Sequence, residues 1–253
     1  MPYTMKAIGT SCCLGVEVIK KELNIDLLIC NTLDFETAYK TIDYNSKFFD
    51  FNKKIILSNR DETIEGYDIH NIGRFNSIQD YSDFMPRLIE YLDSDYLLLI
   101  QDDGHIVNPE LWDERFLDFD YIGAPWPSSE RWLKRFKKYE YYDIVSKNFK
   151  YNRVGNGGFS LRSRKFLEYC SGFSNCEGVP EDIYFCIINY EKAIEKSIKF
   201  APFELAYKFS AEHSFSKYFN KHPKNNSIFK EDNHFGWHGK RFDNSETLLN
   251  LKF

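Results

Sequence analysis

The chain has 253 residues, which suits one large α/β domain or at most two small ones. Hydrophobic residues make up 43% of it and charged residues 28%, a balance typical of globular chains and not of disordered ones. The 33 basic and 38 acidic residues give a net charge of −5, which argues against general nucleic-acid binding because neutralising phosphates needs a basic surface. No apolar run reaches the roughly 18–20 residues that span a bilayer, and the first residues lack a signal-peptide core, so we expect neither a secreted nor an integral membrane protein.

The six cysteines include no C-x-x-C pair, and a chain of this length needs no disulfides. The adjacent Cys12 and Cys13 suggest either a metal or redox site or simply reduced thiols in a cytoplasmic protein. Under the second interpretation, Cys30 and Cys186 pack as small apolar side chains.

In the first half of the chain, short apolar runs alternate with helical patterns, which predicts a parallel or mixed sheet flanked by helices. Strands are expected at 25–30, 54–57, 96–100 and 120–124, and helices at 35–49 and at 78–92, the latter broken or started near Pro86.

The second half is less regular. Residues 154–161 resemble a strand interrupted by glycines, and Ser163 is expected to cap a short helix that Gly172 closes. An amphipathic helix is expected over 183–198, started by Pro180-Glu181-Asp182.

Two adjacent carboxylates, Asp102 and Asp103, directly follow the most hydrophobic expected strand. In open α/β sheets ligands bind at the carboxyl ends of the strands, and Mg²⁺ or Mn²⁺ prefers carboxylate oxygens and often shares its shell with substrate phosphates. The pair is therefore a candidate site for a cation and a diphosphate. The alternative is an ordinary Asp-Gly turn.

Three further features are candidates for a site. The run Gly155-Asn156-Gly157-Gly158 allows a backbone to approach a ligand closely, or forms a tight turn. Glu181 and Asp182 at a helix start are either capping residues or a general base, whose pKa the helix dipole would hold low. His238 is a candidate metal or phosphate ligand, or a structural histidine; His105, His213 and His234 are weaker candidates.

The segment 131–142 departs from the acidic average, with five basic residues and several large aromatic side chains. One interpretation is a solvated helix whose lysine and arginine stems cover apolar surface. The other is a flap on the acceptor side of an enzyme, resting on anionic lipid where the acceptor is lipid-linked.

Taken together and in this order, the blocks Gln-Asp-Asp-Gly, Tyr-Ile-Gly-Ala-Pro-Trp, Val-Gly-Asn-Gly-Gly-Phe-Ser-Leu-Arg-Ser, Pro-Glu-Asp and Phe-Gly-Trp-His-Gly are more informative than each alone. They resemble a bacterial family assigned to glycosyl transfer, found in polysaccharide and glycan gene clusters and long classified as a domain of unknown function. The resemblance runs from about Asn76 to Gly239 and is most specific in 121–126 and 154–163.

The resemblance implies a GT-A-like fold, a Rossmann-type mixed sheet flanked by helices in a single domain. Residues of about 25–125 would form the half that binds the nucleotide sugar, about 126–240 the acceptor-binding and catalytic half, and 241–253 a tail. The sequence 101–104 resembles the Asp-x-Asp motif of that fold, but Gln101 replaces the first Asp. Asp103 is then the better metal ligand and Asp102 a contact to sugar or ribose.

The resemblance further implies that Asp182, or else Glu181, is the catalytic base of an inverting enzyme and that His238 completes the metal and diphosphate site. We expect a cytoplasmic glycosyltransferase that uses a nucleotide-diphosphate sugar and a divalent cation, Mn²⁺ or Mg²⁺. Its acceptor would be a glycan or a lipid-linked glycan, the latter with peripheral contact to the inner membrane surface. Thr32 is the expected nucleotide contact. Asn156, Gly157 and Gly158 would line the donor sugar or the approach of the acceptor, and Trp126 would stack on a sugar face.

Two alternatives remain open from the sequence. A sugar-phosphate nucleotidyltransferase shares the fold class and the need for a cation, but usually carries a glycine-rich basic loop near its start, where this chain offers only Gly9 and Gly15. A non-catalytic module that binds a glycan or a nucleotide would keep the fold without turnover.

Overall fold

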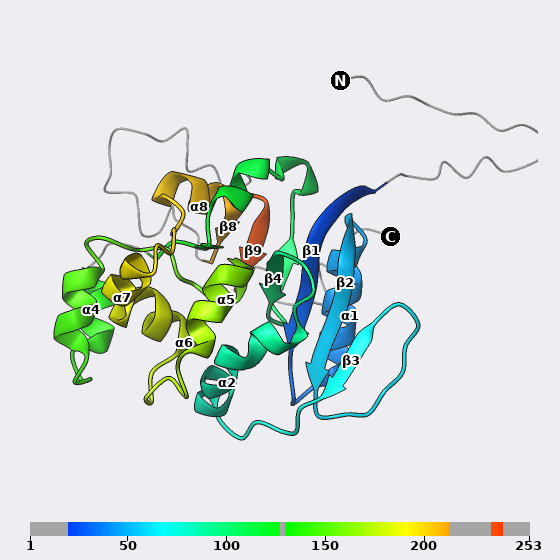
Figure 1. Cartoon of the computed structure of the whole chain (residues 1–253), viewed down its shortest axis with the longest axis horizontal. Helices are drawn as coiled ribbons and strands as arrows, with labels where there is room; N and C mark the ends of the chain where they lie inside the picture. Colours follow the sequence, from blue (N-terminus) through cyan, green and yellow to red (C-terminus); the bar gives the residue numbers. More distant parts are fainter. Residues whose placement is uncertain (1–19, 127–129, 213–233, 240–253) are drawn as a thin grey trace, which may run out of the picture.

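The computed structural model describes residues 20–126, 130–212 and 234–239. Cys12, Cys13, His213 and the tail 241–253 lie outside the described residues. The centre of the molecule is a six-stranded sheet in the order β3-β2-β1-β4-β7-β6 (Figure 1). The strands β3, β2, β1 and β4 run parallel, whereas β7 is antiparallel to both of its neighbours, β4 and β6. The expected α/β class with a mixed sheet is therefore confirmed.

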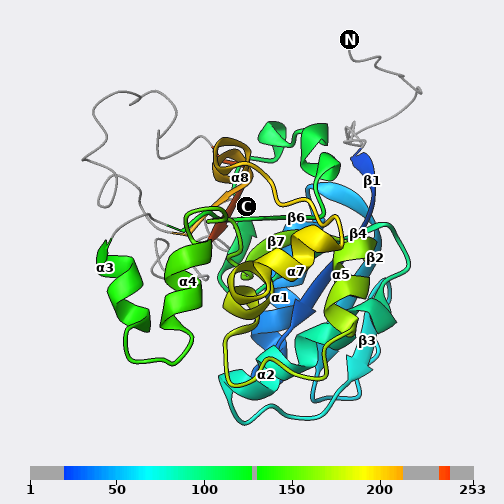
Figure 2. The ribbon, with the colours of Figure 1, turned by 60° about the vertical axis from the view of Figure 1, so that its left-hand side comes forward.

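The parallel strands are hydrophobic because helices cover both of their faces. Leu27, Leu28 and Ile29 of β1 are fully buried, as are Leu97 and Ile100 of β4. The helix α1 lies on one face of the sheet, and α2 and α5 lie on the other (Figures 1 and 2). The elements of this half are β1 (Lys21–Cys30), α1 (Phe35–Ser46), β2 (Phe49–Ser58), β3 (Asp68–Asn71), α2 (Ile78–Phe84), the 3₁₀ helix η1 (Met85–Tyr91) and β4 (Tyr96–Ile100).

A second, three-stranded sheet in the order β5-β9-β8 continues from the end of β4. The remaining elements are β5 (Gly104–Ile106), η2 (Pro109–Leu111), η3 (Glu114–Asp118), β6 (Tyr121–Gly123), α3 (Glu130–Leu133), η4 (Lys134–Phe136), α4 (Tyr142–Asn148), β7 (Phe159–Ser163), α5 (Arg164–Ser171), α6 (Glu181–Ile183), the π-helix η5 (Tyr184–Ile188), α7 (Tyr190–Glu195), α8 (Phe203–Phe209), β8 (Ser210–Ala211) and β9 (Gly236–His238). None of the helices in the described part of the chain has the length and apolar character needed to cross a bilayer.

Several expected elements are confirmed. The strand 96–100 is β4, and α5 is capped by the Ser163 hydroxyl, which accepts a hydrogen bond from the Phe166 amide, and closed at Gly172. The thiols of Cys30 and Cys186 are free and buried. The break near Pro86 is also present, since α2 passes into η1 at that point.

The helix expected over 35–49 ends at Ser46, because Phe49 already begins β2. Two other expected elements were wrong in more than their end residues. The strand expected at 154–161 begins only at Phe159, because the glycine run before it forms a loop. The single helix expected over 183–198 is instead the three-residue α6, the π-helix η5 and the short α7. In η5 the amide of Asn189 donates to the carbonyl of Tyr184, so the widened turn interrupts the regular helical hydrogen bonding.

Asn45 joins α1 to the second sheet. Its side-chain amide donates to the Gly104 carbonyl at 3.1 Å, and its oxygen accepts from the Ile106 amide at 2.7 Å. β9 pairs with the opposite edge of β5. On this edge the fully buried Asn45 makes the hydrogen bonds that a neighbouring strand would otherwise make. It thereby holds β5 and the turn that precedes it.

We predict that Asn45→Ala lowers the free energy of unfolding by about 2–4 kcal/mol, because two buried backbone groups of β5 lose their partners. The control is Asn71→Ala, an exposed site where we expect a change within about 0.5 kcal/mol. Urea unfolding measures both. Equal, small effects would show that Asn45 does not hold β5.

Candidate active site

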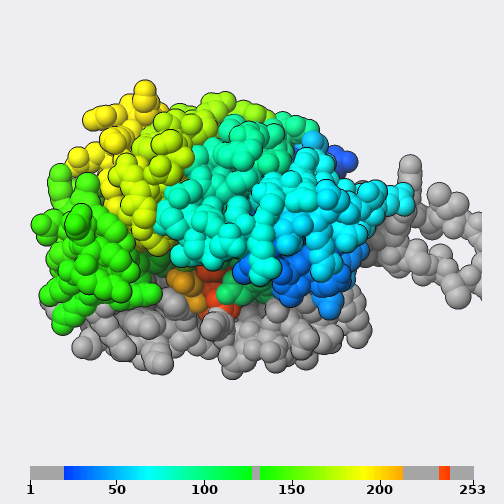
Figure 3. All heavy atoms as spheres, turned by 90° about the horizontal axis from the view of Figure 1, so that it is seen from below, coloured from blue at the N-terminus to red at the C-terminus, as the bar shows by residue number. Residues whose placement is uncertain are grey.

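A cavity of about 660 Å³ opens at the carboxyl ends of β1 and β4. The residues that follow these two strands line it, together with the start of α2: Cys30, Asn31, Thr32, Leu33, Phe75, Asn76, Ser77, Ile78, Tyr81, Gln101, Asp102 and Asp103. Viewed along this side of the molecule, atoms of β9 reach the surface between the first-half residues and the later segments (Figure 3). We name the cavity at the strand ends the first cavity; no residue of β9 is among those that line it.

Asp102 is held in the first cavity by Asn31. The Asn31 amide donates to one carboxylate oxygen of Asp102 at 2.7 Å, while the Asn31 oxygen accepts from the amides of Leu33 and Asp34. Burial raises the pKa of Asp102, and the bond from Asn31 opposes that rise. The second oxygen, Oδ1, is buried without a hydrogen-bond partner in the described structure and is available to a ligand hydroxyl or a cation.

Asp103 meets His238, which arrives from β9. Asp103 Oδ1 and His238 Nε2 lie 3.1 Å apart, and the Oε1 atom of Gln101 lies 3.2 Å from the same nitrogen. Gln101 is in turn held by Tyr81, whose hydroxyl oxygen accepts from its side-chain amide. Burial lowers the pKa of His238, but the bond and the charge of Asp103 outweigh it and the net pKa is raised.

We tested whether these residues suit a divalent cation. The described residues include no group of three or more His, Cys, Asp or Glu side chains arranged to hold a metal. They do offer the pair Asp103 and His238 and the unpartnered oxygen of Asp102. Two protein ligands fit Mg²⁺ or Mn²⁺ when substrate phosphates and water complete the shell, so the donor set suits a cation bound together with a diphosphate.

The glycine loop lies between this pair and the next part of the site. A Cβ atom on Gly158 would lie 2.0 Å from His238 Nε2, and one on Gly157 would lie 2.2 Å from Glu181 Oε1. The Gly158 carbonyl accepts from the Gln101 amide, and the Gly158 amide donates to Asn156 Oδ1. Glycine is needed at both positions because a side chain would occupy the space of a site residue.

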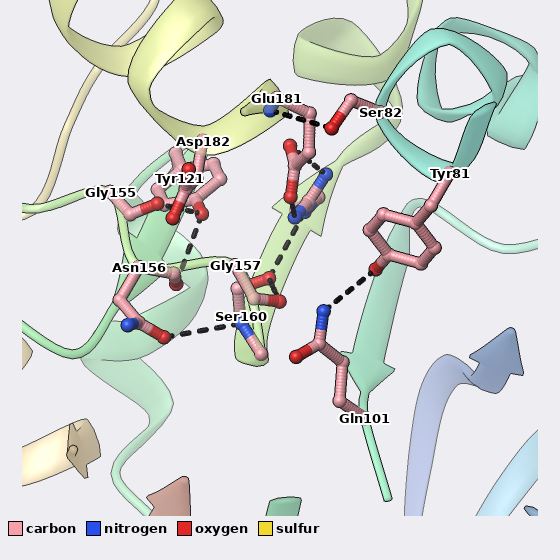
Figure 4. A network of polar contacts seen from close by, with 12 residues as sticks. Tyr81, Ser82, Gln101, Tyr121, Gly155, Asn156, Gly157, Ser160, Glu181 and Asp182 are labelled. Carbon is pink, nitrogen blue, oxygen red and sulfur yellow. Dashed lines mark hydrogen bonds and ion pairs between the residues drawn. The ribbon is translucent and has the colours of Figure 1, made fainter. Parts of the chain in front are cut away.

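Glu181 does not face the cavity. Its carboxylate is bound by both terminal nitrogens of Arg162, at 2.9 and 3.2 Å, and both side chains are almost completely buried. Burial lowers the pKa of Arg162, yet the charge of Glu181 raises it well above its ordinary value. The Ser160 hydroxyl accepts from Arg162 Nε, so the pair is fixed on β7 (Figure 4). Glu181 is thus committed to an ion pair within the fold.

Asp182, one residue later, points to the other side. Figure 4 shows it beside Tyr121 and Asn156, whereas Glu181 is directed toward Gly157 and Ser160. Asp182 lines a separate cavity of about 580 Å³, the second cavity. Its other lining residues are Trp126, Trp132, Arg135, Phe136, Lys138, Tyr139, Tyr141, Asn156, Pro180, Ile183 and Glu212.

The pKa expected for Asp182 was wrong in sign. Burial, followed by the neighbouring charge of Glu181, raises it to about 7, although the bond from the Ile183 amide acts in the opposite direction. The hydrogen bond at the helix start lowers the pKa by less than burial and the charge of Glu181 raise it. A carboxyl group with a pKa near neutrality is suited to accept a proton at physiological pH.

The other expected residues fall into three groups. Thr32 lines the first cavity, but its hydroxyl oxygen is occupied by the Phe75 amide at 2.8 Å. Trp126 and Asn156 line the second cavity instead of the first. His105 is buried against Tyr44, with its pKa lowered to about 4 chiefly by burial, and His234 is buried beside Trp237.

Sequence reasoning missed three residues of the site: Asn31, Arg162 and Asn45. Asn31 follows the first strand directly, and its polar side chain at a strand end was as good a signal as that of Thr32. Arg162 lies within a buried strand, where an arginine requires a carboxylate partner. Nothing in the local sequence pointed to Asn45.

The fold defines an α/β protein, and a cavity lined by polar residues lies at the carboxyl edge of its sheet. A family model described as "Protein of unknown function (DUF5672)" matches residues 67–238, more than half of the chain, and the chain belongs to that family. This range nearly coincides with the stretch of the resemblance found in the sequence. No curated protein matches the chain in sequence.

Among solved structures, the galactosyltransferase LgtC in complex with donor and acceptor sugar analogs aligns over 85% of this chain and 86% of its own, at 13% identity and a TM-score of 0.48. A glycosyltransferase involved in the glycosylation of the major capsid of PBCV-1 aligns over 90% and 97%, at 11% identity and a TM-score of 0.44. The mannosyltransferase PcManGT from Pyrobaculum calidifontis, in complex with GDP-Man and Mn²⁺, aligns over 72% and 55%, at 8% identity and a TM-score of 0.41. These similarities concern the arrangement of the α/β elements, and the functional proposal is argued from the side chains.

We predict that Asp182→Asn stabilises the protein at pH 8. The folded-state pKa of about 7 exceeds that of an unfolded aspartate, so the stability that Asp182 contributes is present at low pH and is lost as the pH rises through 7. One pKa unit corresponds to about 1.4 kcal/mol, and we expect a gain of at least about that size at pH 8 that shrinks toward pH 4.

Urea unfolding at both pH values measures the effect. The matched control is Asp143→Asn, because Asp143 is also in the first turn of a helix but is exposed. A variant at position 182 that is less stable than wild type at pH 8 would contradict the raised pKa.

Proposed function

We propose that the protein is a glycosyltransferase that moves a sugar from a nucleotide-diphosphate sugar to a hydroxyl group of a glycan or lipid-linked glycan, with inversion at the anomeric carbon. The observation that carries this proposal is the pair of cavities on either side of the glycine loop. One has the strand-end carboxylates that suit a cation and a diphosphate, and the other has Asp182 with its raised pKa.

The division of the chain supports the assignment of the two cavities. Every residue that lines the first cavity lies between 30 and 103, and every residue that lines the second lies between 126 and 212. We therefore propose that about 25–125 bind the nucleotide sugar and about 126–240 bind the acceptor, within one domain. Asn156, Gly157 and Gly158 would separate donor sugar from acceptor.

In the proposed reaction, Asp182 accepts the proton of an acceptor hydroxyl while that oxygen attacks the anomeric carbon from the side opposite the diphosphate. The unpartnered oxygen of Asp102 would accept a hydrogen bond from a donor hydroxyl, with Asn31 fixing its orientation. Glu181, bound to Arg162, would orient Asp182 and take no proton. A Mn²⁺ or Mg²⁺ ion held by Asp103 and His238 would offset negative charge on the departing diphosphate.

The direct test is release of nucleoside diphosphate from a panel of nucleotide sugars by the purified chain, with and without Mn²⁺ or Mg²⁺. Release in the presence of acceptor sugars, with NMR showing an inverted anomeric centre in the product, supports the proposal. Pyrophosphate release from a nucleoside triphosphate and a sugar phosphate would favour a nucleotidyltransferase instead. Binding without any turnover would favour a non-catalytic module. Fractionation of the producing cells would test the cytoplasmic location that we propose.

We predict that Asp182→Asn lowers kcat by about 10²–10⁴-fold while the Kd for the donor stays unchanged, because a general base acts in the transfer step. For the wild type, kcat/KM should rise with pH up to about 7 and then level off, since Asp182 must be deprotonated to act. Steady-state kinetics from pH 5 to 9 measure both. Asp143→Asn serves as the control, and a position-182 variant that keeps more than a tenth of wild-type kcat would remove this residue from the role.

We also predict that chelation with EDTA abolishes transfer, that Mn²⁺ or Mg²⁺ restores it, and that Asp103→Ala imitates chelation. The physical reason is the loss of the charge that would offset the leaving diphosphate. The exposed Asp61→Ala is the control for removal of a carboxylate. Full activity in EDTA would mean that the leaving group is stabilised by protein side chains alone.

A further inference from the structure

The second cavity has a chemical character of its own. Its floor is aromatic and continuous with the core: Trp132 stacks on Phe149 with ring centroids 4.6 Å apart, and Trp126 packs against both rings. Toward the opening, Tyr139 and Tyr141 stack at 5.0 Å, and Tyr139 is 41% exposed. Flat apolar surfaces with a few polar groups are typical of sites for small molecules such as sugars.

Two positive charges line this aromatic cavity. Arg135 and Lys138 are both among its lining residues, on the segment between α3 and α4. Neither forms an ion pair with any carboxylate in the described part of the chain, although the protein as a whole is acidic. The two cations are therefore available to a ligand.

The orientation of the cations follows from their spacing. Arg135 and Lys138 are three residues apart, which brings both to the cavity side of a helical turn. Trp132, three residues before Arg135, and Tyr139, four residues after it, lie on the same side. The neighbouring Lys134 and Lys137 are exposed and do not line the cavity. Of the four basic residues at 134–138, two thus face the cavity and two face solvent.

The negative charges of the cavity come from different elements. Asp182 projects from α6, and Glu212 follows β8. A ligand with one negative group would be repelled from Asp182 and attracted to Arg135 and Lys138. Such a ligand would be oriented, with its charge on the segment 134–141 and its uncharged hydroxyl groups toward the candidate base.

We propose that the second cavity binds an acceptor sugar that carries an anionic group, a carboxylate or a phosphate ester, held by Arg135 and Lys138 while the aromatic side chains contact the sugar ring. This inference rests on the proposed function in that it names the ligand as the acceptor, but the binding itself does not require turnover. Charge-assisted hydrogen bonds from arginine and lysine are the strong contacts that carboxylates and phosphates receive in proteins.

The test measures binding of three probes that share a glucose ring: methyl glucoside, methyl glucuronide and glucose 6-phosphate. Titration followed by tryptophan fluorescence reports on the cavity, because Trp126 and Trp132 line it. We expect the wild type to bind at least one anionic probe about tenfold more tightly than the neutral glucoside. The two anionic arms show whether the carboxylate or the phosphate ester is the preferred group.

The decisive comparison uses two double variants of equal charge. Arg135→Gln with Lys138→Gln should reduce the preference for the anionic probe to about that for the glucoside, whereas Lys134→Gln with Lys137→Gln should keep it. All four positions are exposed, so both proteins are expected to fold, which circular dichroism checks.

Equal binding of the charged and neutral probes by the wild type, or no binding of any of them, would overturn the inference. Equal loss in both double variants would also overturn it, because the effect would then come from overall charge. Donor hydrolysis is measured in parallel on the same proteins. If it is absent while charge-selective binding is present, the proposed transfer reaction fails and the anion site stands.

Discussion

The buried ion pair of Arg162 and Glu181 is the interaction on which the candidate site depends. Both side chains leave water almost completely, and losing either partner from such a pair costs about 3–5 kcal/mol, because the other is left as an uncompensated charge. The pair joins β7 to the start of α6. Gly157 lies against the same carboxylate, so the path of the glycine loop is set by the pair as well. Asp182 on one side and the glycine loop on the other both adjoin this contact, and the loop is held in addition by the backbone amide of Gln101 and the hydroxyl of Tyr121.

The two adjacent carboxylates show how position alone separates structural from chemical roles. Glu181 receives two hydrogen bonds from a guanidinium, whereas Asp182 receives one from its neighbouring backbone amide and faces a cavity lined by aromatic rings. Burial therefore costs Asp182 more than its surroundings return, and its proton is held more tightly. The paired charge and the unpaired one lie one residue apart, and the first contributes to the raised pKa of the second.

Much of the parallel half could be predicted from the sequence, because its signals are local. Residues close together in the chain determine both the hydrophobic runs of strands buried on two faces and the caps of helices. The strand β4 and the helix α5 with Ser163 and Gly172 at its ends are examples. The carboxylate pair at the end of β4 was found for the same reason. The π-helix η5, the short strands β5, β8 and β9 and the bonds of Asn45 depend on contacts between distant segments. The pairing of Arg162 with Glu181 could not be derived either, since it depends on how completely the fold excludes water at these two side chains. The raised pKa of Asp182 depends in turn on its partial burial beside the charge of Glu181.

The small second sheet has a consequence for the order in which the molecule matures. Its central strand, β9, is the last strand among the described residues, where β5 and β8 pair with no strand other than β9. During synthesis, the parallel strands and their helices are complete long before residue 236 is made, whereas β5 and β8 must wait for it. His238 reaches Asp103 only when β9 inserts between β5 and β8. A growing chain can thus hold a folded first half while its strand-end carboxylates still lack their histidine, so assembly of the candidate site would be a late event of folding and not an early one.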